Sequence, residues 1–172
     1  RELDMPVQTI YFGGGTPSIL NFSELELIFS TIRKHYQIVP DCEITFEVNP
    51  EDINEANLLY WKGLGINRLS IGLQTFSDED LLWMNRAHHV HDGLAGIQLA
   101  QQCGFDNISV DLIYGLPGQS LAAWDASLQA VFKLGVQHLS AYCLTIEPKT
   151  ALNHLVRQKK LQPADEIGRA HV

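Results

Sequence analysis

Two carboxylates stand in apolar stretches where an acidic side chain could do chemistry. Glu47 and Asp111 could work as an acid/base pair, or they could accept hydrogen bonds from ribose hydroxyls or a ligand ammonium group. The alternative is structural, because interior carboxylates commonly bond to neighbouring residues, here Thr45, Asn49 or Arg68. From residue type alone, the structural interpretation is favoured.

A run of three glycines follows the first apolar stretch, in the segment Gly13–Ser18 (GGGTPS). Consecutive glycines allow positive φ angles and let a ligand approach the bare backbone. The Walker motif is absent, since no Lys-Ser or Lys-Thr follows, and a dinucleotide fingerprint would need glycine where Ser18 stands. A ligand-binding loop and a tight turn without a ligand remain equal alternatives.

Other polar residues are less specific. Gln74 has no ionisable group and could serve only in hydrogen bonding, and Arg86 alone reads as a solvated residue at a helix end. His88, His89 and His91 lie close together, but metal-binding helices more often space histidines four residues apart. We therefore expect a polar surface junction there, with haem or metal ligation as the alternative.

The cysteines and the charge limit the possible classes of protein. Cys42, Cys103 and Cys143 are 61 and 40 residues apart, which argues against a disulfide framework and predicts a cytoplasmic location. None forms the close pair typical of zinc or iron–sulfur sites. The net charge of −8 argues against binding to nucleic acid or to an anionic membrane surface. The sequence as given shows no signal peptide and no apolar run of about 18 residues, and a targeting segment lost with an N-terminal piece remains the alternative.

The hydrophobic pattern alternates between strands and helices. The expected strands are residues 7–12, 43–48, 68–73, 108–113 and 138–144. The first expected helix begins at residue 23, and the others cover residues 53–64, about 77–85, about 91–103 and 122–134. Ser23 and Glu26 have the spacing of a capping box, and Phe22 could pack on Leu27. The order predicts an α/β fold with a parallel sheet, and periodicity leaves a doubly wound sheet and a (β/α) barrel both open.

Polar or glycine-rich residues recur at the C-terminal ends of four expected strands. These positions are Gly13–Ser18, Glu47 with Asn49, Gly72–Gln74, and Asp111 with Tyr114–Gly118. Because parallel α/β folds bind ligands at this rim, the arrangement predicts a small-molecule site.

Six ordered motifs over roughly residues 7–152 carry a family resemblance: GGGTPS, EITFEVNPE, NRLSIGLQTF, NRAHH, DLIYGLPGQS and LTIEPKT. Together they resemble the coproporphyrinogen oxidase-like branch of the radical S-adenosylmethionine (SAM) superfamily. That branch includes oxygen-independent coproporphyrinogen III oxidases and HemW-type haem chaperones. The resemblance implies a partial (β/α) barrel with SAM at the C-terminal rim and a [4Fe–4S] cluster in the full-length protein.

The resemblance also implies roles for eight residues. It assigns backbone contacts with the SAM amino-acid portion to Gly14, Gly15 and Thr16. It assigns SAM-contacting side chains to Glu47, Gln74, Arg86 and Asp111. It assigns a backbone contact with adenine to Cys143.

One family hallmark is missing from the sequence. The Cys-x3-Cys-x2-Cys motif holds the cluster in this family, and Cys42, Cys103 and Cys143 do not match it. The resemblance places that motif before Arg1, so we expect a fragment that is inactive alone. Residues 1–166 would form an incomplete radical SAM core, and residues 167–172 (IGRAHV) would be a non-native tail that reads like a translated sequencing adapter.

Two segments separate the functions within the branch. LTIEPKT and GLPGQS resemble the chaperone group more than the decarboxylases, which implies haem binding and delivery to acceptor proteins such as respiratory enzymes. Contact with membranes would then be indirect, through those acceptors. The alternative is oxidative decarboxylation of coproporphyrinogen III. A tRNA-modifying or methylthiolating enzyme is disfavoured by the absence of a basic surface.

Overall fold

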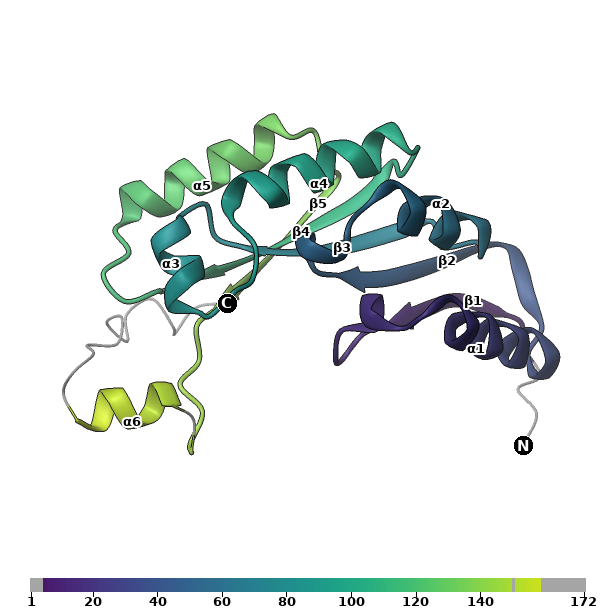
Figure 1. Ribbon diagram of the computed structural model, residues 1–172, viewed down its shortest axis with the longest axis horizontal. Helices are drawn as coiled ribbons and strands as arrows, with labels where there is room; N and C mark the ends of the chain where they lie inside the picture. The colour runs from purple at the N-terminus through teal and green to yellow at the C-terminus, as the bar shows by residue number, and fades with distance from the viewer. Residues whose placement is uncertain (1–4, 150, 159–172) are drawn as a thin grey trace.

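A computed structural model describes residues 5–149 and 151–158, in which five strands form one sheet (Figure 1). The strands are β1 (Val7–Phe12), β2 (Ile38–Val48), β3 (Arg68–Gln74), β4 (Asn107–Tyr114) and β5 (His138–Cys143). The helices are α1 (Phe22–His35), α2 (Glu55–Gly63), α3 (Asp78–Trp83), α4 (Val90–Gln102), α5 (Leu121–Lys133) and α6 (Ala151–Arg157). Two short 3₁₀ turns, Pro17–Ile19 and Pro50–Asp52, follow β1 and β2. The expected non-native tail, residues 167–172, lies outside the described residues.

The strand order decides between the two architectures that periodicity left open. The order is β1-β2-β3-β4-β5, and every neighbouring pair is parallel. A doubly wound sheet would reverse its order at a switch point, and this sheet does not. It curves into a half-barrel with α1, α2, α4 and α5 on its outer face (Figure 1). The predicted α/β fold with a partial barrel is therefore confirmed.

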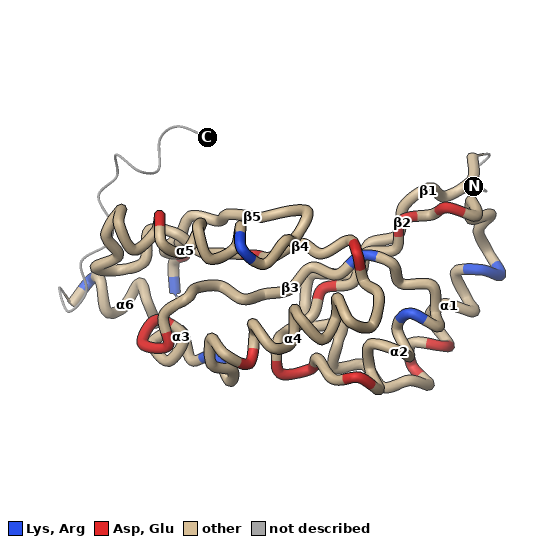
Figure 2. Tube along the Cα trace, turned by 90° about the horizontal axis from the view of Figure 1, so that it is seen from above, with Lys and Arg blue, Asp and Glu red and all other residues tan. Residues whose placement is uncertain are grey.

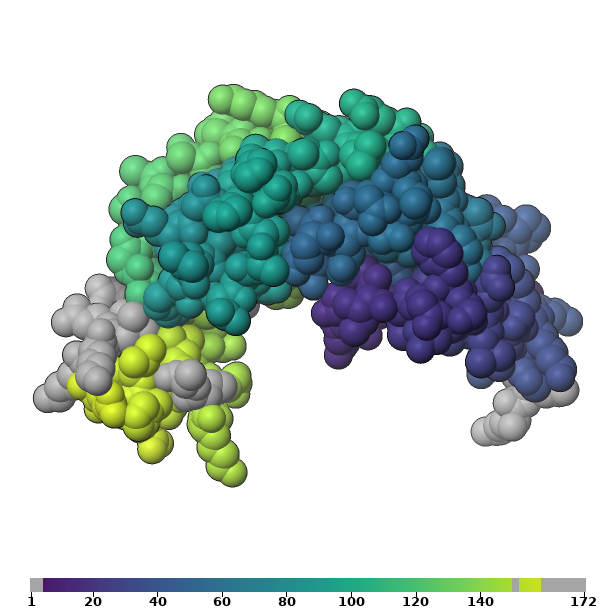
Figure 3. All heavy atoms as spheres, in the orientation of Figure 1, coloured from purple at the N-terminus to yellow at the C-terminus, as the bar shows by residue number. Residues whose placement is uncertain are grey.

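Alternation along the strands gives the sheet an apolar outer face and a polar inner face. On β2, Ile44, Phe46 and Val48 are buried beneath the helices, as the sequence predicts. Glu47 points to the opposite face, where the register sets it beside Ser70 of β3. The inner face borders the hollow of the arch in Figure 3.

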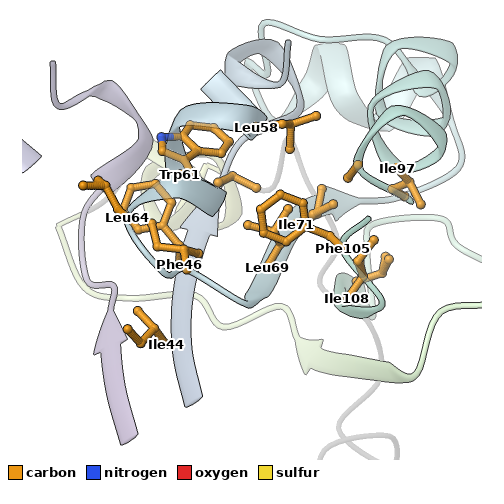
Figure 4. Packing of buried hydrophobic residues seen from close by; sticks show 14 of the residues in the cluster. Ile44, Phe46, Leu58, Trp61, Leu64, Leu69, Ile71, Ile97, Phe105 and Ile108 are labelled. Carbon is orange, nitrogen blue, oxygen red and sulfur yellow. The ribbon is translucent and has the colours of Figure 1, made fainter. Parts of the chain in front are cut away.

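Aromatic rings fill the core between the sheet and the first two helices (Figure 4). The Phe46 side chain is fully buried, and its ring centroid lies 5.3 Å from that of Trp61 on α2. Phe12 of β1 lies 5.8 Å from Phe46 and 5.0 Å from Phe29 of α1. These contacts fix α1 and α2 against the strands whose ends form the rim.

The start of α1 differs from the expected one. Its N-cap is Asn21, whose side chain accepts a hydrogen bond from the Glu24 N–H, so the capping box lies two residues before the predicted Ser23 pair. Phe22 stacks on Tyr60 of α2, with ring centroids 3.8 Å apart, where Leu27 was the expected partner. Asn is as good a cap as Ser, and a sequence offering both leaves the choice to packing.

Candidate functional site

The C-terminal ends of β2, β3 and β4 and the glycine loop enclose a pocket of about 180 Å³, called here the rim pocket. It is lined by Gly15, Thr16, Glu47, Val48, Asn49, Ser70, Gly72, Gln74, Arg86 and Asp111. Six of the eight predicted site residues are in this set. The fold thus brings together residues that are far apart in the sequence.

Glu47 is held in place by the strand and loop beside it. Tyr11 donates a hydrogen bond to Glu47 Oε1 at 2.7 Å, and the Gly14 N–H donates to Oε2 at 3.2 Å. Partial burial, this hydrogen bond and the nearby carboxylate charges raise the pKa of Tyr11 to about 12, so Tyr11 remains a donor at neutral pH. The expected partners of Glu47 did not include Tyr11, whose position two residues before the glycines is its only sequence signal.

The glycine loop leaves room for the Glu47 carboxylate. A Cβ at Gly13 would lie 2.5 Å from both Glu47 Oε1 and Tyr11 Cε1. Gly14 has a φ of +84°, and a Cβ there or at Gly15 would meet nothing within 4 Å. Gly13 is therefore required by packing and Gly14 by backbone conformation, while the space above Gly14 and Gly15 is open.

Asp111 also lines the rim pocket, where it accepts hydrogen bonds from the hydroxyl of Ser70. The Ser70 hydroxyl lies 3.0 and 3.2 Å from the two carboxylate oxygens of Asp111. Burial raises the pKa of Asp111 above its ordinary value, and hydrogen bonds from Ser70 and Ser140 oppose that rise only in part. The expected partner Arg68 instead donates to Thr45, at 3.2 Å. Burial thus makes the charged form of Asp111 less favourable than it would be in water.

Replacing Asp111 with asparagine is expected to stabilise the ligand-free chain at pH 7. The pKa of Asp111 is higher in the folded chain than its unfolded value of about 3.8. The protonated carboxyl therefore contributes stability that is fully present below pH 3.8 and is lost as the pH rises through the folded-state pKa. Asp111→Asn removes this loss, and the free energy of unfolding should rise by about 1 kcal/mol at pH 7. Urea denaturation at pH 7 and near pH 4 measures the gain, which should shrink at the lower pH.

The exposed Asp106, at the other end of β4, provides the matched control for that measurement. Asp106→Asn removes the same charge from a chain of net charge −8, so it reports any general relief of repulsion. Equal changes in the two variants at pH 7 would contradict a specific cost at Asp111.

Gln74 and Arg86 reach the rim pocket through two left-handed residues. Gln74 itself has a φ of +71°, just after an irregularity in the pairing of β3 with β4. The α3 helix ends at Trp83 with Met84 as its C-cap, and the next residue, Asn85, has a φ of +56° and donates to the Leu82 carbonyl at 3.0 Å. The Arg86 N–H then donates to the Leu81 carbonyl at 2.9 Å. This Schellman ending turns the chain back, and Arg86 lines the pocket instead of standing as a solvated helix end.

Two predicted site residues lie outside the lining of the rim pocket. Gly14 borders it, since its N–H bonds to Glu47. Cys143 is the last residue of β5 and pairs in register with Tyr114, half-buried. An expected backbone contact with adenine at Cys143 remains a prediction.

The histidine cluster divides into one buried and two exposed side chains. His88 is buried, which corrects the expectation of a surface junction for this residue. Its Nδ1 lies 3.1 Å from Glu51 Oε2, and its Nε2 lies 3.5 Å from the Leu73 carbonyl oxygen. His89 and His91 are exposed, as expected. Over residues 5–149 and 151–158, no three His, Cys, Asp or Glu side chains are grouped to hold a metal ion.

A second cavity of about 540 Å³, called here the side cavity, lies next to the rim pocket. It is lined by Trp83, Met84, Asn85, Arg86, Leu144, Leu152 and Leu155. Sequence reasoning missed both this cavity and α6. The spacing of Leu152 and Leu155 on one helix face was the available signal.

Acidic residues are spread along the helical layer. Figure 2 shows them on α2, α3 and α4, where Glu55, Asp78 and Asp92 stand in the first turns. Negative side chains at helix N-termini complement the helix dipoles. Among the described helices, none is long and apolar enough to cross a membrane.

Comparison with known proteins gives a family match and curated relatives. The profile of the radical SAM superfamily matches residues 1–131. The chain is 38% identical to the haem chaperone HemW of Synechocystis over 156 residues, covering 91% of this chain and 38% of that protein. It is 38% identical to HemW of Escherichia coli over 144 residues, covering 84% of this chain and 38% of that protein. The chain thus spans about two fifths of the length of these relatives.

Solved structures share the fold. Coproporphyrinogen III oxidase (HemN) of Escherichia coli, a radical SAM enzyme, superimposes with a TM-score of 0.77 at 31% identity, covering 91% of this chain and 35% of that chain. The archaeal Elp3 of Methanocaldococcus infernus superimposes with a TM-score of 0.76 at 20% identity, covering 92% of this chain and 42% of that chain. At that identity, the Elp3 likeness is a likeness of fold.

Proposed function

Since the chain belongs to the radical SAM superfamily, we propose that its rim pocket binds SAM and that it is part of a HemW-like haem chaperone. The observation that carries the SAM proposal is the meeting of Glu47, Gln74, Arg86 and Asp111 in one pocket. The similarity to HemW of Synechocystis and Escherichia coli supports the chaperone proposal.

The side chains of the rim pocket fit the chemistry of SAM. SAM carries an ammonium group, a carboxylate and two ribose hydroxyls. Glu47 and Asp111 accept hydrogen bonds from ammonium or hydroxyl groups, and the Arg86 guanidinium pairs with a carboxylate. The open space above Gly14 and Gly15 lets a ligand approach the backbone. The pocket would bind and orient SAM, which in this superfamily supplies a radical on one-electron reduction.

The chain's cysteines do not fit a [4Fe–4S] cluster. Cys42 is buried beneath the helices, Cys103 is the C-cap of α4, and Cys143 is the last residue of β5. Their places on three separate elements do not bring three thiolates to one point, and the described residues hold no metal-binding group. The cluster would therefore be held by cysteines outside this sequence.

Anaerobic reconstitution of the 172-residue chain with iron and sulfide is expected to give no stoichiometric [4Fe–4S] absorbance. The reason is the absence of a three-cysteine ligand set with suitable spacing. Iron and sulfide analysis alongside the absorption spectrum measures the outcome. One full cluster per chain would show this interpretation to be wrong.

Two variants on the same strand test the SAM site. Glu47→Gln removes the carboxylate charge from the rim pocket and should weaken SAM binding about tenfold in calorimetry. Glu43→Gln makes the same change on the same face of β2, away from the pocket, and should leave the affinity unchanged. Equal affinities for wild type and Glu47→Gln would refute the assignment of Glu47.

The chaperone proposal includes partners and a location. Haem is the proposed cargo and haem-acceptor proteins are the proposed recipients, with membranes involved only through those acceptors. Nucleic acid is not a proposed partner, because the net charge of −8 repels it. The three free cysteines favour a reducing cytoplasm.

An oxygen-independent coproporphyrinogen III oxidase is the second candidate, and the likeness to HemN favours it. The two functions are separated by measuring haem binding and coproporphyrinogen III turnover together, in a protein that carries this chain with a cluster-binding segment. Stable haem binding without turnover supports the chaperone. Turnover at enzymatic rates without stable haem binding would overturn it.

A further inference from the structure

The side cavity has the size and lining of a ligand site, and of its seven lining residues the SAM proposal uses Arg86 alone. Its volume of about 540 Å³ is within the range of about 300–1,000 Å³ typical of small-molecule pockets. The end of α3, the residue after β5 and helix α6 form its walls, and Figures 1 and 2 both show α3 and α6 at the same end of the sheet.

We propose that the side cavity binds the tetrapyrrole macrocycle, with Arg86 pairing with a propionate carboxylate. This inference rests on the proposed haem chaperone function and assigns that function a place in the fold.

The lining favours a large, flat, apolar ligand. Trp83, Met84, Leu144, Leu152 and Leu155 supply apolar or aromatic surface from three separate segments. Trp83 is 39% exposed, which leaves part of a large aromatic residue accessible beside the cavity that it lines. An aromatic macrocycle that stacks on Trp83 and covers the leucines would remove this surface from water.

The charge of the lining favours an anionic ligand edge. Arg86 is the charged residue among the seven described residues that line the cavity, and none of the seven is acidic. The lining is therefore positively charged, although the chain as a whole has a net charge of −8. A guanidinium binds carboxylates through paired hydrogen bonds, which matches the propionate side chains of a tetrapyrrole.

Arg86 also lines the rim pocket, so the two cavities meet at this residue. Its guanidinium has five N–H donors and would pair with the SAM carboxylate on one side and a propionate on the other. Its place is set by the Schellman ending of α3, in which Asn85 is left-handed. A macrocycle in the side cavity would therefore lie beside the proposed SAM site.

Hemin titration of the 172-residue chain, followed by the Soret absorbance, tests the proposal with a matched pair of variants. Leu155→Glu places a charge in the lining and should weaken hemin binding at least tenfold. Leu82→Glu makes the same change at a residue that is 80% exposed, next to Trp83 but outside the lining, and should bind as wild type does.

A second measurement keeps the test valid if Leu155→Glu disturbs α6. Arg86→Gln should weaken hemin binding about tenfold and leave the affinity for hemin dimethyl ester unchanged, because the ester lacks the propionate charges. Wild-type affinity for hemin in both Leu155→Glu and Arg86→Gln would overturn the location and leave the chaperone proposal standing. Failure of the wild-type chain to bind hemin would overturn the location, and the side-by-side measurement described above would still decide the chaperone function.

Discussion

A chain carrying Gly13→Ala is expected to fold normally and to lose SAM affinity about tenfold. The added Cβ would lie 2.5 Å from Glu47 Oε1, a separation that van der Waals contact forbids. The carboxylate is the flexible partner, so it would turn away and give up its hydrogen bonds from Tyr11 and Gly14. The loss of one charge-assisted contact corresponds to about a tenfold change in affinity. Calorimetric titration with SAM measures it.

Gly63→Ala is the control for this prediction. Gly63 ends α2, it is exposed, and a Cβ there would meet nothing within 4 Å. Alanine at an exposed helical position should leave SAM binding unchanged and should not destabilise the chain. SAM affinity equal to wild type in Gly13→Ala would mean that Glu47 does not hold SAM in the position that the rim pocket gives it.

The largest expected effect on stability belongs to Phe46→Ala. Phe46 is fully buried and contacts the rings of Phe12 and Trp61, so its removal leaves a cavity between β1, β2 and α2. Such truncations cost about 3–5 kcal/mol. Because small domains are stable by only about 5–15 kcal/mol, urea denaturation should show a large fall in the midpoint.

Phe132→Ala makes the same deletion on the surface. The Phe132 side chain is 66% exposed on α5, and its loss should change the free energy of unfolding by no more than about 0.5 kcal/mol. Similar midpoints for the two variants would mean that the rings around Phe46 do not form the stabilising core.

The elements could be predicted from the sequence because their patterns are local. The alternation of Ile44, Phe46 and Val48 with Thr45 and Glu47 predicted both a strand and its two faces, and the structure has both. The same periodicity could not choose between an open sheet and a barrel. That choice depends on which strands become neighbours in the sheet. A short stretch of sequence carries no information about that pairing.

The parts that the sequence did not predict depend on contacts between distant segments. β2 begins at Ile38, five residues before the expected start, because Val7 of β1 pairs with it. His88 is buried because the Pro50–Asp52 turn brings Glu51 to its ring. The side cavity needs Trp83 and Leu155 together, and they are 72 residues apart. Residue type gives no signal for such pairings.

The strand order has a consequence for the growing chain on the ribosome. Within the part of the chain that the structure describes, each strand of the sheet pairs with the strands next to it in sequence. When each β-α unit leaves the exit tunnel, the preceding strand, with which its own strand pairs, has already been synthesised. The next unit then adds to the free edge of the sheet. The sheet can therefore assemble in the direction of translation, without waiting for a distant segment to close it.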